Sequence, residues 1–242
     1  MVKSKPTVDE YLKTLNGGRI LDVATGTGSC IRLLMAHLKS YDSFTGIDTV
    51  FKAVETARKN FSGTNYKFVQ MNADELAFRY EGFDTVSVCY SLHHFSSPLT
   101  VLLELKRAIK PGGHLLVFEM TRDVTSEPQR MHYLVHTFWA EIDRLYAVPH
   151  YETYSSKQLK SMMMKLDMSH MDVILQTEHQ QSQDPFDPKI MTSILESIDQ
   201  CLNKIKAHPM YATYKSKGIS IRDQIEKNGF LPAPLLFFCA QK

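Results

Sequence analysis

The sequence predicts an α/β protein built on a doubly wound, parallel β-sheet. Between about residues 19 and 120, short and continuously apolar segments alternate with segments of helical periodicity. Strands that are apolar along their whole length are typical of a parallel sheet covered by helices on both faces. The chain has 242 residues, of which 43% are hydrophobic, so one α/β domain with an insertion can bury a sizeable core. We therefore expect a single domain over residues 1–242.

The elements of the first half can be placed in order. Five strands are predicted where apolar and β-branched residues are dense: 19–23, 43–48, 66–69, 83–90 and 114–118. Apolar residues recur at helical spacing in three segments between these strands: 29–38, 50–61 and 99–109. The run from Lys110 to Gly113 should end the third helix, because proline cannot continue a helix and glycine permits a turn.

The pattern loosens after residue 120. Residues 121–150 are rich in aromatic side chains and histidines, 156–168 has helical spacing, and 171–175 resembles a strand. The stretch 178–230 looks mainly helical and is inserted before a closing apolar strand, 234–240. We interpret the insertion as a lid over a binding site or as a subunit contact, and a homodimer is compatible with it.

Composition narrows the class of protein. The net charge of +2 gives no reason to expect nucleic acid as a partner. No apolar run approaches the roughly 18–20 residues needed to span a bilayer, and no signal peptide is apparent. The four cysteines form no CxxC pair, and Cys89 and Cys239 lie in apolar runs, as buried small hydrophobic residues do. We expect no disulfide framework and a cytoplasmic protein.

The strongest chemical signal is the turn from Leu21 to Gly28, between the first strand and the first helix. Small residues there allow a tight turn and a close approach of the backbone to a ligand. One alternative is a turn that binds nothing. Another is a dinucleotide site, but Ile31 occupies the position where that motif has its third glycine. A nucleoside-type cofactor without a pyrophosphate remains the best fit.

Asp48 supports a nucleoside. It ends the second strand, about twenty residues beyond the glycine turn, where a carboxylate can accept both ribose hydroxyls of an adenosine. The simpler interpretation is a polar cap at the end of the strand. Combined with the glycine turn, the ribose interpretation is favoured.

Five segments in this order resemble the class I S-adenosylmethionine-dependent methyltransferases, especially the small-molecule group that includes ubiquinone and menaquinone C-methyltransferases. They are the glycine turn, the acid that ends the second strand, the segment 72–74, the segment 91–95 and the run 110–113. The resemblance implies a Rossmann-like, mostly parallel, seven-stranded sheet with an antiparallel last strand. It also implies S-adenosylmethionine as cofactor and S-adenosylhomocysteine as product.

The same resemblance implies which residues hold the cofactor. Ala24 stands where many members of the family have the first glycine, which is a mild departure. Asp74 would accept a hydrogen bond from the adenine amine, although an aspartate after a strand can also be a helix cap. The cofactor-binding residues expected from the resemblance are Asp22, Ala24, Thr25, Gly26, Gly28, Asp48, Thr49, Asn72, Ala73, Asp74, Tyr90 and Ser91.

Methyl transfer from a sulfonium is an in-line displacement in which the protein aligns the reactants and excludes water. A base is needed only if the acceptor must lose a proton, and the candidates are His94, His132 and His136. His132 and His136 share a helical face, and with His150 they could suggest a metal site. No cysteine or carboxylate cluster accompanies them, so we expect no metal.

The sequence thus predicts an enzyme that transfers a methyl group to a small organic acceptor, with C-, O- and N-methylation all open. Two alternatives are a non-catalytic subunit that binds S-adenosylmethionine and a methyltransferase acting on RNA or protein. A nicotinamide dehydrogenase is disfavoured by Ile31. Residues 121–150 and 178–230 are expected to wall the acceptor pocket, since the segment before the first strand is short.

Overall fold

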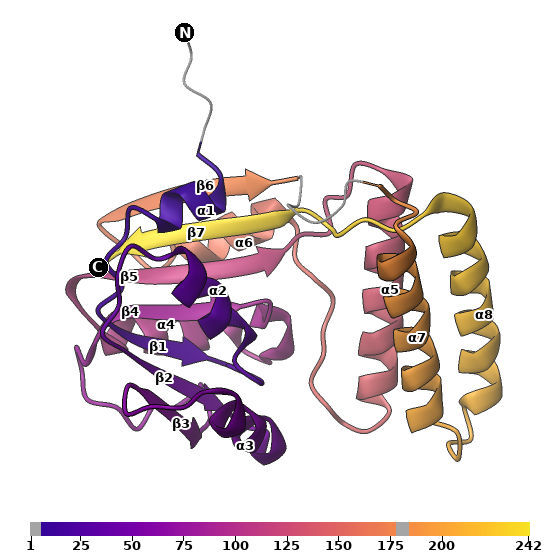
Figure 1. Ribbon diagram of the computed structural model, residues 1–242, viewed down its shortest axis with the longest axis horizontal. Coiled ribbons are helices and arrows are strands. Elements are labelled where there is room, and N and C mark those ends of the chain that lie inside the picture. The colour runs from indigo at the N-terminus through magenta and orange to yellow at the C-terminus, as the bar shows by residue number, and fades with distance from the viewer. Residues whose placement is uncertain (1–5, 178–183) are drawn as a thin grey trace, which may run out of the picture. The chain divides into compact units, whose positions relative to one another are not determined.

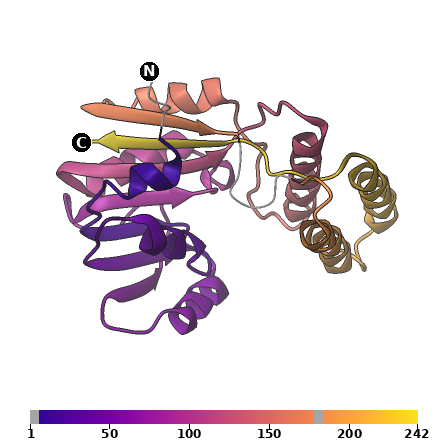
Figure 2. The same ribbon diagram turned by 45° about the horizontal axis from the view of Figure 1, so that its top comes forward.

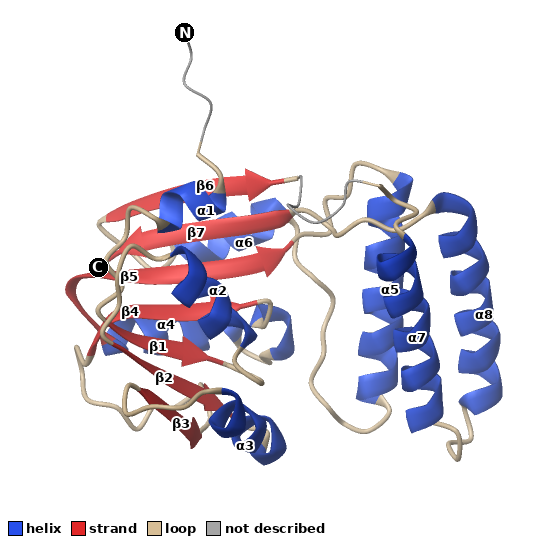
Figure 3. Ribbon diagram, viewed as in Figure 1, coloured by secondary structure: helices blue, strands red, loops and turns tan. Residues whose placement is uncertain are grey.

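A computed structural model describes residues 6–177 and 184–242, and it contains the predicted sheet (Figure 1, Figure 3). Seven strands are ordered β3-β2-β1-β4-β5-β7-β6. Their bounds are β1 Arg19–Val23, β2 Ser43–Asp48, β3 Tyr66–Gln70, β4 Phe83–Cys89, β5 Ile109–Met120, β6 His170–Gln176 and β7 Leu235–Gln241. All five strands predicted before residue 120 are present, as are the two predicted later.

Strand direction and order place the carboxyl ends of the first five strands along one edge. β1 pairs in parallel with β2 and with β4, β2 pairs in parallel with β3, and β4 pairs in parallel with β5. β7 runs antiparallel to β6, which confirms the predicted antiparallel last strand. The order of the strands along the chain reverses between β1 and β4, and in open α/β sheets ligands bind outside the strand ends at such a switch point.

Helices cover both faces of the sheet (Figure 1, Figure 2). On one face lie α1 Val8–Leu12, α2 Ser29–His37 and α3 Phe51–Asn60; on the other lie α4 Pro98–Ala108 and α6 Ser156–Met164. The first set packs on Phe44, Phe118 and Phe237, all of which are fully buried. The short helix α1 was not predicted from the sequence; a capping box between Thr7 and Glu10 begins it.

The chain divides into two compact units. The first contains the sheet and these helices, and comprises residues 1–119, 157–176 and 235–242. The second, residues 120–156 and 177–234, contains the helices α5 Glu127–Arg144, α7 Pro188–Lys204 and α8 Tyr211–Asn228. These three helices share a core of their own, in which Phe138, Ile198 and Ile225 are fully buried. The helical character predicted for 178–230 is present, except that residues 178–183 lie outside the described residues.

Two local expectations from the sequence differ from the structure. α4 ends at Ala108, and residues 109–113 belong to β5 instead of turning the chain. Backbone pairing explains this, because Gly112 N–H donates to the carbonyl oxygen of Lys242 and Lys242 N–H donates to that of Gly113. Pairing with the end of the chain is a tertiary effect that the local sequence does not show.

The cysteines also differ from expectation. Cys30 and Cys89 form a disulfide that joins the beginning of α2 to the end of β4, whereas we expected reduced thiols throughout. Cys239 is buried and free, as its apolar surroundings predicted. Among the residues that the structure describes, none of the helices is long and apolar enough to cross a bilayer.

Candidate cofactor site

The glycine turn between β1 and α2 has an unusual backbone. Ala24, Gly26 and Gly28 all adopt the left-handed conformation, with φ of 54°, 54° and 91°. A Cβ atom on Gly28 would collide with the ring of Phe61, whereas a Cβ atom on Gly26 would meet nothing within 4 Å. The turn is therefore closed against α3 at Gly28 and open at Gly26, which leaves room for a ligand against the backbone there.

Substitution by alanine can test the different surroundings of Gly26 and Gly28. Gly28→Ala should lower the free energy of unfolding by at least about 2 kcal/mol, because left-handed φ costs an alanine roughly 1–2 kcal/mol and the methyl group also meets Phe61. Gly26→Ala is the matched control, since it has the same backbone strain without the collision. We expect Gly26→Ala to fold but to weaken cofactor binding. Equal losses of stability in both variants, measured by urea unfolding, would contradict this distinction.

The buried side chain of Asp22 stabilises the turn through hydrogen bonds. Its carboxylate is fully buried and accepts hydrogen bonds from Thr25 Oγ1 at 2.6 Å and Ser87 Oγ at 2.7 Å. Burial raises the pKa of Asp22 to about 6, although the hydrogen bonds from Thr25 and Ser87 oppose the shift. Asp22 and Thr25 were both expected to hold cofactor; in this structure they hold each other, and Thr25 N–H also donates to the carbonyl oxygen of Ile47.

The raised pKa has a consequence for stability. Between the unfolded value of 3.8 and the folded value of about 6, the folded protein keeps a proton that the unfolded chain loses. Through this group the free energy of unfolding should rise by about 1 kcal/mol as the pH falls from 7 to 5. Asp22→Asn removes the titration, so the wild-type protein should gain more stability than the variant over that range. Urea unfolding at both pH values measures the difference, and an equal change in the two proteins would show that Asp22 does not titrate as expected.

Asp48 connects the ends of β1 and β2. Its carboxylate accepts Gly26 N–H and Val50 N–H, both at 2.8 Å. An ionised carboxylate has about four acceptor positions, so two hydrogen bonds of this kind leave capacity for ribose hydroxyls. The adjacent Thr49 is exposed, and its carbonyl oxygen accepts the side-chain amide of Gln70.

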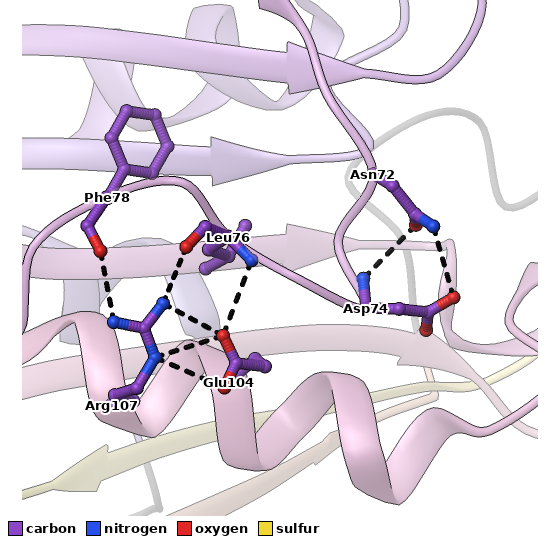
Figure 4. A network of polar contacts seen from close by, with 6 residues as sticks. All are labelled: Asn72, Asp74, Leu76, Phe78, Glu104 and Arg107. Carbon is purple, nitrogen blue, oxygen red and sulfur yellow. Dashed lines mark hydrogen bonds and ion pairs between the residues drawn. The ribbon is translucent and has the colours of Figure 1, made fainter.

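The segment after β3 contains the residues that the resemblance assigned to the adenine, Asn72 to Asp74. Asn72 Oδ1 accepts the backbone N–H of Asp74 at 3.1 Å, both side chains are exposed, and Ala73 between them is buried (Figure 4). Two residues of α4 hold the rest of this loop. Arg107 donates to the carbonyl oxygens of Leu76 and Phe78 and to the carboxylate of Glu104, as Figure 4 shows. No feature of the local sequence marked Arg107 or Glu104.

At the end of β4 the backbone again turns sharply, with Tyr90 at φ 49°. Tyr90 is 40% exposed, so its desolvation is partial; desolvation, and secondly the charge of Glu119, raise the pKa of its hydroxyl above the usual value. Ser91 Oγ donates to the carbonyl oxygen of Cys89. The following residues Leu92–His94 form a single 3₁₀ turn.

The end of β4 also carries a pair that sequence reasoning missed. His93 Nδ1 lies 3.0 Å from Glu119 Oε1, and Glu119 Oε2 accepts Leu92 N–H at 2.8 Å. His93 is 2% exposed and Glu119 is fully buried. The sequence drew attention to the His93-His94 pair, of which His94 was the predicted base; the two rings are tilted by 42° with their centroids 4.5 Å apart. A carboxylate ending an otherwise apolar strand, as Glu119 ends β5, was a signal that could have revealed the pair.

The other two predicted bases lie in the second unit, both on α5. His132 Nδ1 accepts Ala233 N–H at 2.7 Å. His136 Nε2 lies 3.1 Å from His150 Nε2. At the ends of β1 and β2, Thr25 is thus hydrogen-bonded to Asp22 and the next residue, Gly26, to Asp48, so the four residues form one network. His132 and His136 make separate contacts, with Ala233 and His150.

Comparison with known proteins finds similarity to methyltransferases. Residues 21–117 match the family described as methyltransferase domain. A demethylmenaquinone methyltransferase of Thermotoga maritima is 32% identical over 118 residues, covering 49% of this chain and 50% of that protein. The chain spans about half the length of the curated relatives it matches.

Solved structures extend the likeness of the fold to nearly the whole chain. The [4+2]-cyclase SpnF has a TM-score of 0.60 at 19% identity, covering 97% of this chain and 78% of that one. Phosphoethanolamine N-methyltransferase 2 of Haemonchus contortus, crystallised with S-adenosylhomocysteine, has a TM-score of 0.57 at 19% identity, covering 94% and 49%. The predicted resemblance to methyltransferases is thus found by sequence over residues 21–117, and the solved structures share the fold over nearly the whole chain.

Proposed function

We propose that this protein transfers a methyl group from S-adenosylmethionine to a small organic acceptor. The observation that carries the proposal is the network at the ends of β1 and β2, where the open backbone at Gly26 adjoins the Asp48 carboxylate. A ribose bound there has a charged acceptor for its hydroxyls. The remaining residues expected from the resemblance, Asn72 to Asp74 and Tyr90 to Ser91, follow the next strand ends along the same edge.

The chemistry follows from this position. The acceptor attacks the methyl carbon, the bond between carbon and sulfur breaks, and the electron pair passes to sulfur, which leaves neutral S-adenosylhomocysteine. An acceptor that carries an acidic O–H or C–H must also lose a proton. We propose that His93 is the base that accepts this proton. The Glu119 carboxylate accepts the Nδ1–H of His93, and in this tautomer the acceptor lone pair lies on Nε2.

A quinol-type aromatic acceptor suits a histidine base, since a phenol becomes a better nucleophile when it loses its proton. The relatives named demethylmenaquinone methyltransferase motivate this choice. His94, His132 and His136, the bases that the sequence predicted, stay alternative candidates for the role of base. Residues 121–150 and 178–230 stay the proposed determinants of acceptor choice, because β5 ends at Met120 and leads directly into the second unit.

Cofactor binding is the first test. We expect calorimetry to show binding of S-adenosylmethionine and S-adenosylhomocysteine, and much weaker binding of NAD, because Ile31 occupies the position of the third glycine and is fully buried. Turnover is then measured by mass spectrometry, as S-adenosylhomocysteine formed with a short-chain demethylmenaquinol. Tight NAD binding without binding of either sulfur nucleoside would refute the proposal.

One alternative to methyl transfer is supported by a structural similarity. The similarity to the cyclase SpnF shows that this fold does not by itself imply methyl transfer. A chain that binds S-adenosylmethionine and never converts it with any acceptor would be a binding subunit or a different enzyme. Formation of S-adenosylhomocysteine separates these cases.

A further inference from the structure

A second cluster of polar side chains lies in the second unit, at the carboxyl end of α5. His136 and His150 are 4% and 5% exposed, and their Nε2 atoms lie 3.1 Å apart. The two rings are nearly perpendicular, at 79°. Asp143 Oδ2 lies 2.8 Å from His150 Nδ1. The Nε2 atoms of the two imidazoles thus face each other at hydrogen-bond distance, with a carboxylate behind one ring.

The chain is bent to bring these side chains together. α5 ends at Arg144, and Ala147 adopts a left-handed conformation with φ 56°. Such a conformation in a residue other than glycine costs roughly 1–3 kcal/mol and is found most often at functional sites. Two hydrogen bonds hold the bend: Val148 N–H donates to the carbonyl oxygen of Asp143, and Arg144 Nη1 donates to that of His150 at 2.6 Å. His150 is thereby fixed beside a residue fourteen positions earlier.

The carboxylate decides which nitrogen of His150 carries hydrogen. Asp143 can only accept when ionised, so Nδ1 of His150 donates to it. In the neutral ring the lone pair then lies on Nε2 and accepts the Nε2–H of His136. A metal ion bound by both nitrogens would displace this hydrogen, which leaves His136 as a proton or moves to its Nδ1. An imidazole whose far nitrogen donates to a carboxylate is the arrangement found around protein-bound metal ions, where the carboxylate fixes the tautomer and strengthens the ligand.

The separation of the nitrogens fits one metal ion. With metal–nitrogen distances of 2.0–2.1 Å in tetrahedral geometry, two ligand nitrogens lie about 3.3 Å apart. The observed 3.1 Å is close to this value. The geometry points to a site for a late first-row divalent ion such as zinc, ligated by His136 and His150 Nε2 and positioned by Asp143. Nitrogen ligands favour zinc, copper, nickel or cobalt over magnesium and calcium.

The site departs from what the sequence predicted. The sequence grouped His132, His136 and His150 as a possible metal site, but we expected no metal because no cysteine or carboxylate cluster accompanied them. In the structure His132 Nδ1 accepts Ala233 N–H, and His150 takes the place beside His136. Asp143 is the carboxylate whose absence argued against a metal, and it lies seven residues after His136, two turns along the same face of α5.

Calorimetric titration of the full chain with zinc tests the site, with magnesium as the control ion. We expect the wild-type protein to bind one zinc ion that His136→Ala and His150→Ala each lose or bind at least tenfold more weakly. Asp143→Asn keeps both ligands and should weaken binding 10- to 100-fold. Zinc should also raise the unfolding temperature of the wild-type protein and not that of the ligand variants. The matched control is His170→Ala, because His170 is a histidine with 64% of its side chain exposed, outside the cluster.

Two results would overturn the proposal. One is the absence of zinc binding by the folded wild-type protein. The other is zinc affinity that is unchanged in His136→Ala, His150→Ala and Asp143→Asn, since the ion would then bind elsewhere. Circular dichroism shows which variants fold. If either alanine variant does not fold, the zinc affinity of Asp143→Asn is compared with that of the wild type instead. Neither readout depends on methyl transfer, so this proposal and the proposed function can fail separately.

Discussion

Replacing His93 with glutamine is expected to lower kcat for methyl transfer by 10²- to 10⁴-fold, the usual range for loss of a general base. Glutamine keeps a polar side chain of similar length but cannot take a proton. The affinity for S-adenosylmethionine should stay nearly unchanged, because His93 acts on the acceptor. Steady-state kinetics with a quinol acceptor and calorimetry with the cofactor measure the two quantities separately.

Glu119→Gln should reproduce part of this loss. Its amide still accepts one hydrogen bond, from Leu92 N–H or from His93 Nδ1, but it no longer supplies the charge that stabilises a protonated imidazole. The neighbouring His94→Gln is the matched comparison, since His94 lies in the same 3₁₀ turn and its ring lies 4.5 Å from that of His93. If His94→Gln loses more activity than His93→Gln, the base is His94, as the sequence alone suggested. If neither variant has a lower kcat, neither His93 nor His94 accepts a proton from the acceptor.

Removing the Asp48 carboxylate is expected to weaken binding of S-adenosylmethionine at least tenfold in Asp48→Ala. A hydrogen bond to a charged acceptor contributes about 1.5–3 kcal/mol, and 1.4 kcal/mol corresponds to a factor of ten. The loss should exceed that of the ribose contacts alone, because Asp48 also accepts the N–H groups of Gly26 and Val50. Calorimetry gives the affinity, and urea unfolding gives the accompanying loss of stability.

The control for Asp48 is Asp42→Ala. Asp42 is exposed and precedes β2 at its amino end, whereas Asp48 closes β2 at the carboxyl end, so the same substitution is made at opposite ends of one strand. We expect Asp42→Ala to leave cofactor affinity within twofold of the wild type. Equal affinities in the two folded variants would show that the ribose is held elsewhere.

The positions of the strands in the first unit, and the parallel class of the sheet, could be predicted because they depend on local patterns. Buried parallel strands require continuous apolar runs, and those runs appear at 19–23, 43–48 and 114–118. The glycine turn and Asp48 could be predicted for the same reason, because each lies at a fixed distance from a strand end. Their contacts with a cofactor stay predictions, because what the structure shows is the hydrogen bond from Gly26 N–H to the Asp48 carboxylate.

What the sequence determined by itself is therefore the sheet, its helices and the identity of the turn that adjoins Asp48. Only the tertiary structure decided the partnerships between side chains distant along the chain. Glu119 faces His93 because β4 and β5 are neighbours, Cys30 meets Cys89 because α2 begins beside the end of β4, and His150 meets His136 because the chain bends back at Ala147. Periodicity predicts which face of a helix or strand a residue occupies, but a pairing between elements depends on how they pack in three dimensions.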